Sequence, residues 1–329
     1  MDILVLFGTF ILLVILTIPI GYAIGISTLV TLVCFTNMPL ALITQNAITG
    51  VDSFPLMAIP FFMLAGNFMR YGGISKRLLD LADNIVGFFT GGLGAITTFT
   101  AMFYAAISGS GPATVSAIGS MMIPEMEKEK YDKAWATAIT CCGGIIGVII
   151  PPSIPFVLYS LATGVSTGDL FLAGVIPGIL IGLFMMAYAE CMSKQRIRAK
   201  MSELRGNGFL KLFADSFFAL LCPIIVLGGI YSGIVTPTEA ACVSVFYALF
   251  VSLVVYRSIT LKDLIPFLAS SVKTYGGLAF VLAFATAFGR VLSLTRATKV
   301  IEDFIVGNFT TSWSVLSVLV ILFLILGMV

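Results

Sequence analysis

The chain has 329 residues, of which 59% are hydrophobic and only 10% are charged, with a net charge of +2 and no histidine. Soluble domains carry about 25% charged residues, so this composition predicts a polytopic membrane protein and excludes an ordinary soluble domain. The small net charge gives no support for nucleic-acid binding. Six cysteines lie in or beside apolar segments without metal-ligand spacing, which argues against a disulfide framework.

We expect an all-α fold made of membrane-spanning helices. Each such helix needs about 20 apolar residues, and the chain contains several apolar runs near that length. A shorter segment, residues 75–86, places Leu78 and Leu81 on one helical face and Lys76 and Asp80 largely opposite, which predicts an interfacial amphipathic arm helix. The candidate membrane segments are residues 3–17, 20–36, 54–69, 133–163 with an interruption, 170–192, 214–235, 238–256 and 272–290.

A serine-, glycine- and proline-rich stretch, residues 106–116, separates two apolar segments, 88–107 and 112–124, neither of which is a comfortable full span. Together they predict a re-entrant hairpin over 88–124. A second break follows at 143–155, within the interrupted segment 133–163. Backbone groups that are freed at membrane depth survive only inside protein or against a cavity, and broken helices of this kind carry the sites of many secondary transporters. We therefore interpret the two breaks as one site, the alternative being simple helix packing or a kink.

The basic loop at 193–213 predicts the orientation of the chain, because positively charged loops stay in the cytoplasm. Alternating the spans backward from this loop places both ends of the hairpin in the cytoplasm and the N-terminus in the periplasm.

An internal repeat appears when the sequence is shifted by 220 positions. The matches include charged and glycine positions in register, namely Arg70 with Arg290, Asp83 with Asp303 and Gly87 with Gly307. The two copies run in opposite orientations, so we expect an inverted-topology repeat. The first copy is residues 1–192, with scaffold helices at 1–69, the arm helix, the hairpin, the broken helix and a connecting helix at 170–192. The second is residues 214–329, with an arm helix at 295–306 and the start of a second hairpin. Its tip would fall at position 328, so we expect the natural protein to continue for roughly a hundred residues.

The residues at the breaks indicate the ligand. They offer hydroxyls, glycines and carbonyls freed by Pro151, Pro152 and Pro155, but no carboxylate or imidazole. This chemistry favours Na⁺ over a divalent ion or a proton relay. The helix N-termini after the breaks favour an organic anion as the substrate.

The motifs SGSGPATVSAIG (108–119), IGVIIPPSIPFVLY (146–159), GVIPG (174–178) and GIVTPTEAA (233–241) resemble the large membrane subunit of TRAP (tripartite ATP-independent periplasmic) transporters. The resemblance covers the whole chain. It implies an elevator-type fold of the ion transporter superfamily and sodium-driven import in the bacterial inner membrane. It also implies two partners, a small membrane subunit and a periplasmic substrate-binding protein, and a carboxylate substrate such as a C4-dicarboxylate or sialic acid.

Carried onto this chain, the resemblance and the breaks give two sets of candidate binding residues, one for sodium and one for the substrate. We expect Na⁺ as the coupling ion and no organic cofactor. Arg290 is included as the repeat partner of Arg70, although its place near a membrane surface also fits an anchor. The sodium set is Ser108, Gly109, Ser110, Gly147, Val148, Ile150 and Pro151, and the substrate set is Gly111, Thr114, Ser116, Pro152, Ser153 and Arg290.

Three alternatives stay open from the sequence. The first is a stand-alone sodium/dicarboxylate symporter of the same superfamily. The second is an intramembrane enzyme, which is disfavoured because the chain has no histidine and no lysine between Arg77 and Lys128 to activate a serine. The third is a non-catalytic scaffold, which would not explain breaks at membrane depth.

Overall fold

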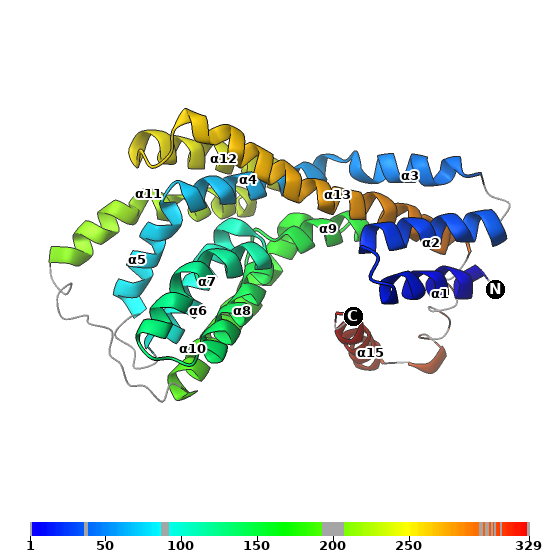
Figure 1. Cartoon of the computed structure of the whole chain (residues 1–329), viewed down its shortest axis with the longest axis horizontal. Helices are drawn as coiled ribbons and strands as arrows, with labels where there is room; N and C mark the ends of the chain where they lie inside the picture. Colours follow the sequence, from blue (N-terminus) through cyan, green and yellow to red (C-terminus); the bar gives the residue numbers. More distant parts are fainter. Residues whose placement is uncertain are drawn as a thin grey trace. The chain divides into compact units, whose positions relative to one another are not determined.

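The computed structural model describes residues 2–35, 39–86, 92–192, 207–295 and 311–327, together with positions 299, 303, 305 and 307–309. All regular structure in these residues is helical, which confirms the all-α prediction. The chain forms two compact units: residues 1–52 with 276–329, and residues 53–275. Helix α13 (Leu264–Leu294) begins in the second unit and ends in the first (Figure 1).

Four described helical segments are long and apolar enough to cross a membrane, which supports a multi-pass membrane protein. Two bent helix pairs bring the count to six if each pair forms one span. The four segments are Thr167–Met192, Phe213–Tyr231, Pro237–Val255 and Leu261–Leu294.

The first unit packs α1 (Asp2–Ile15) against α2 (Ile20–Phe35) and adds the C-terminal half of α13. Leu6, Leu32 and Val291 form its buried core. Glycines on α2 let aromatic rings of α13 approach closely: a Cβ at Gly21 would lie 2.8 Å from the Phe280 ring. The unit also contains α3 (Ala41–Val51) and α15 (Ser312–Leu326).

The second unit has two packed groups of helices. In one, α4 (Ala58–Tyr71) follows the short helix η1 (Phe54–Met57) and packs on α12 (Pro237–Phe250), while α5 (Ile74–Val86) packs on α11 (Asn207–Tyr231). Their shared core includes Phe68, Leu78, Cys222 and Val245. Two short helical segments, η2 (Val251–Val255) and η3 (Leu261–Asp263), lead from α12 toward α13.

The other group of the second unit contains the predicted hairpin and the broken helix, which lie side by side in Figure 1. Its core joins Ile96 and Tyr104 to Ile118, Met122 and Ile139. Its helices are α6 (Gly92–Ser108), α7 (Gly111–Lys128), α8 (Lys133–Ile149), α9 (Ile154–Thr163) and α10 (Thr167–Met192).

Most predicted segments match these helices, with corrections at their ends. Helix α7 continues to Lys128, beyond the predicted hairpin end at 124, and its last turn carries an exposed ion pair of 2.9 Å between the Lys128 ammonium and the Glu125 carboxylate. Helix α11 begins at Asn207, inside the predicted loop 193–213, and ends at Tyr231 rather than 235. Helix α13 starts at Leu264 rather than 272.

Helix α3 was not predicted, because Thr44, Gln45 and Asn46 interrupt its apolar residues. The Asn46 side-chain amide donates to the Leu42 carbonyl at 2.7 Å, so the helix satisfies that polar group internally. Residues 193–206 and most of the predicted second arm helix, 295–306, lie outside the described residues.

Candidate functional site

The tip of the hairpin is a two-residue connection between α6 and α7. Gly109 has φ of +60°, a left-handed conformation that favours glycine. A Cβ at this position would also lie 2.6 Å from the Pro152 carbonyl oxygen. Both the backbone conformation and the close neighbour therefore require glycine at the tip.

The break between α8 and α9 spans residues 150–153 and bends the two helices by 41°. Pro151 and Pro152 have no N–H, so the carbonyls of Gly147 and Val148 lose their helical donors. The Ser153 hydroxyl donates to the Val148 carbonyl and replaces one of them, and the same oxygen caps the start of α9 by accepting from the Phe156 N–H at 3.4 Å. The Gly147 carbonyl is left without a helical donor.

The structure brings the tip and the break together. The backbone N–H of Ile154, the first residue of α9, donates to the Gly109 carbonyl at 3.1 Å. Gly147 of α8 lies against Thr114 and the Ser110 carbonyl of the hairpin, with no space for a side chain. Backbone from two interrupted helices thus meets at one place inside the second unit.

Buried hydroxyls cluster at this meeting point. The hydroxyl oxygens of Ser108 and Thr114 lie 2.9 Å apart, and Thr114 also donates to the Ser110 carbonyl at 2.9 Å. Ser108 is 3% exposed and Thr114 is fully buried. With the Thr114 proton directed at Ser110, lone pairs on the hydroxyl oxygens remain for a cation. The Ser110 oxygen itself caps α7, accepting from the Ala113 N–H at 3.5 Å.

Helices α7 and α8 approach each other through glycines. A Cβ at Gly111 would lie 3.0 Å from the Gly144 carbonyl oxygen, and one at Gly144 would overlap the Val115 side chain. Beside this contact runs an open groove of about 510 Å³. It is lined by Gly111, Pro112, Val115 and Ser116 of α7 and by Cys141, Gly144, Ile145 and Val148 of α8.

The candidate residues lie in three places. The residues of the tip and the break lie together and are mostly buried: Ser108–Ser110, Thr114, Gly147, Val148 and Ile150–Ser153. The groove is lined by Gly111 and Ser116, and Val148 reaches it from the break. Arg290 lies on the part of α13 that belongs to the first unit, so its predicted substrate contact stays a prediction.

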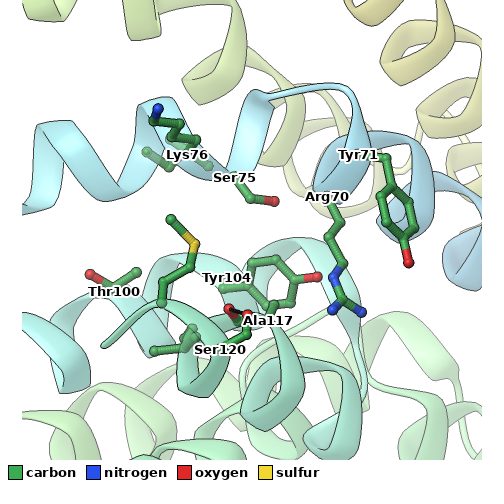
Figure 2. Close-up of a pocket in the computed structure, with 11 residues that line it drawn as sticks. Arg70, Tyr71, Ser75, Lys76, Thr100, Tyr104, Ala117 and Ser120 are labelled. Atoms are coloured by element: carbon green, nitrogen blue, oxygen red, sulfur yellow. Dashed lines mark hydrogen bonds between the residues drawn. The ribbon is translucent and has the colours of Figure 1, made fainter. Parts of the chain in front are cut away.

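A second set of polar residues, which the sequence pattern did not single out as a site, lines a cavity between the hairpin and the helices α4 and α5. Figure 2 shows Arg70 of α4 and Ser75 of α5 facing Tyr104 of α6 across this space. The Arg70 guanidinium donates to the Ser116 hydroxyl at 3.4 Å, so Arg70 of α4 contacts the hairpin. The threonines of α6 at positions 97, 98 and 100 form the sequence pattern from which buried polar groups could have been predicted there.

The possible ligand atoms at the meeting point are uncharged oxygens, which are hard ligands. No group of three His, Cys, Asp or Glu side chains able to hold a metal ion occurs among the described residues. The donors are hydroxyl and carbonyl oxygens, which suit a monovalent cation such as Na⁺. All six cysteines are free in this structure.

The fold and the site together define a class of protein: a helical membrane protein in which a helical hairpin packs its tip into a broken helix, an arrangement that secondary transporters use. The family model described as "Tripartite ATP-independent periplasmic transporter, DctM component" matches residues 7–329, and the chain belongs to this family.

Curated relatives agree with this assignment. The chain is 41% identical over 324 residues to the isethionate TRAP transporter permease protein DctMQ of Oleidesulfovibrio alaskensis, covering 98% of this chain and 51% of that protein. It is 34% identical to the C4-dicarboxylate TRAP transporter large permease protein DctM of Rhodobacter capsulatus, covering 99% and 78%. It is 35% identical to the sialic acid TRAP transporter large permease protein SiaM of Vibrio cholerae, covering 87% and 67%. The chain thus spans about half the length of the first relative, and the names describe permeases rather than enzymes.

Proposed function

We propose that this chain is the ion- and substrate-carrying part of a sodium-coupled importer of a small organic anion. The observation that carries the proposal is the hydrogen bond from the Ile154 N–H to the Gly109 carbonyl, because it joins the two interrupted helices at one point. Around it lie buried hydroxyls and a proline-freed carbonyl, the oxygen ligands that an alkali ion uses at unwound helices.

The anion would bind beside the cation, along the groove between α7 and α8. Two helices begin at the meeting point, α7 after Ser110 and α9 after Ser153, and their N-termini carry positive partial charge. The substrates in the names of the relatives are small organic anions, including a sulfonate, a C4-dicarboxylate and sialic acid. A carboxylate or sulfonate group is therefore the chemistry that we assign to this site.

The remaining parts of the proposal follow the family. A periplasmic binding protein delivers the anion, a small membrane subunit supports the permease in the inner membrane, and the hairpin moves across the bilayer as part of an elevator. The N-terminus lies in the periplasm, as the basic residues after Met192 predict.

Uptake in proteoliposomes tests the proposal. The transporter with its partner subunits is reconstituted, and uptake of labelled isethionate, succinate and sialic acid is measured under an inward Na⁺ gradient and under an equal K⁺ gradient. We expect uptake of at least one anion that requires both the binding protein and Na⁺. Equal uptake under the K⁺ gradient would refute sodium coupling, and full uptake without the binding protein would favour a stand-alone symporter.

A further inference from the structure

The strongest feature outside the proposed transport site is the cavity of about 190 Å³ between the arm helix α5 and the hairpin (Figure 2). It lies wholly within the second unit. Its lining comes from the end of α4 (Arg70, Tyr71), the start of α5 (Ser75, Lys76, Leu78), α6 (Thr100, Tyr104) and α7 (Ala117, Ile118, Ser120, Met121).

The cavity is basic, and none of its described lining residues is acidic. Arg70 and Lys76 both line it, and neither forms an ion pair among the described residues. The polar contact of Arg70 is the 3.4 Å bond to Ser116, and its guanidinium also lies 5.4 Å from the centre of the Tyr71 ring. Asp80, one turn after Lys76 on α5, is the nearest acid in sequence and is exposed. The Asp80 carboxylate attracts the Lys76 ammonium electrostatically, so Arg70 is the cationic side chain of this cavity that lies without a carboxylate partner among the described residues.

Two buried hydroxyls at the cavity also lack a partner among the described residues. Ser75 is 7% exposed and Thr100 is 2% exposed, and the hydroxyl oxygen of each forms no hydrogen bond within that part of the chain. Buried polar atoms in native proteins are rarely left unpaired, so each such atom calls for an explanation. In Figure 2 the Ser75 hydroxyl points into the space between α5 and the hairpin, toward the side where Arg70 and Tyr104 face each other.

We propose that this cavity binds an oxyanion, meaning a phosphate or a similar group with several anionic oxygens. Arg70 would hold two of its oxygens with its planar guanidinium, as arginine does with phosphate and carboxylate groups. The Ser75 hydroxyl would donate to a further oxygen and gain the partner that it lacks. The volume fits one such group with little else, so a sugar acid would not enter whole.

The oxyanion has two possible sources that share this chemistry. One is the phosphate of an anionic phospholipid, because α5 is amphipathic and the apolar Leu78, Ile118 and Met121 border the basic residues. The other is free inorganic phosphate from the aqueous phase. In either case the ligand would sit between the arm helix and the hairpin and draw Arg70 from Ser116, a candidate substrate residue.

The test uses the purified chain in lipid nanodiscs. Thermal unfolding is followed in phosphatidylglycerol discs, in phosphatidylcholine discs, and in phosphatidylcholine discs with sodium phosphate against sodium chloride of equal ionic strength. We expect the midpoint to rise by several degrees with phosphatidylglycerol, with phosphate or with both. A rise with the anionic lipid only identifies the lipid source, and a rise with free phosphate identifies the soluble one.

Variants locate the effect. Arg70→Gln should abolish the rise, and Ser75→Ala should reduce it by at least half, whereas Arg257→Gln should keep it. Arg257 is an exposed arginine of the same unit that does not line the cavity, so it is a matched control for loss of one charge. If Arg70→Gln does not fold, Lys76→Gln takes its place. No rise in any condition, or a rise that Arg70→Gln and Ser75→Ala both retain, would overturn the proposal.

Discussion

Thr114 of the hairpin occupies the space that a side chain at Gly147 of the broken helix would need. The Thr114 hydroxyl forms hydrogen bonds with the Ser108 hydroxyl and the Ser110 carbonyl. The Ser110 carbonyl oxygen itself lies 3.2 Å from the position that a Cβ at residue 147 would take. The contact between the two interrupted helices therefore depends on the absence of one methyl group.

Gly147→Ala should consequently separate the hairpin from the broken helix. Overpacking of a well-packed contact costs about 1–3 kcal/mol, so the variant should unfold at a lower temperature in detergent. Gly228→Ala is the control, since no described residue lies within 4 Å of a Cβ there and alanine favours the helix α11. An equal response of the two variants would contradict the close contact.

Gly109→Ala should destabilise the chain for two reasons that a control can separate. Its left-handed backbone costs an L-residue about 1–2 kcal/mol, and the new methyl would meet the Pro152 carbonyl oxygen. Gly164 has φ of +75° but nothing within 4 Å of a Cβ, so Gly164→Ala carries only the backbone cost. We expect a larger fall in thermal stability for Gly109→Ala. The same fall in both would show that the tip does not lie against Pro152 in the protein.

Ser108→Ala should weaken the dependence of uptake on sodium. The substitution removes one oxygen of the buried pair at the hairpin tip and leaves its size nearly unchanged. We expect the sodium concentration for half-maximal uptake to rise about tenfold, which corresponds to about 1.4 kcal/mol. Ser232→Ala, at an exposed serine after α11, should leave this concentration unchanged. Normal sodium dependence in Ser108→Ala would remove Ser108 from the proposed ion site.

The sequence predicted both interruptions because their physical cause is local. Glycine at the tip and prolines at the break act on their own backbone, so residues 109–110 and 150–153 separate helices as expected. Helix ends were harder to place, since polar residues can stay helical when the helix itself satisfies them. In α13, for example, the Thr274 hydroxyl donates at 2.9 Å to the carbonyl of Ser270, a residue that precedes the predicted start at 272 but belongs to the helix.

The partners across helices could not be predicted. The bond from Ile154 to Gly109 joins residues 45 positions apart, and no local pattern states which carbonyl the first N–H of α9 will meet. The same holds for the bond from Arg70 to Ser116 and for the unpaired hydroxyls of Ser75 and Thr100, which depend on how the arm helix packs on the hairpin.

Replacing Pro151 and Pro152 together by alanine tests whether the break itself is needed. Two new N–H groups could then pair with the carbonyls of Gly147 and Val148, so α8 would extend toward α9 and the 41° bend would decrease. Such a helix cannot present a free carbonyl to a cation, and it would move Ile154 away from Gly109. We expect stability in detergent to be kept or raised while sodium-driven uptake falls at least tenfold. Pro223→Ala is the control, because Pro223 also lies inside a helix of this unit but away from the hairpin tip, and it should retain uptake. If the double variant transports normally, the break is a packing feature and the ion must bind elsewhere.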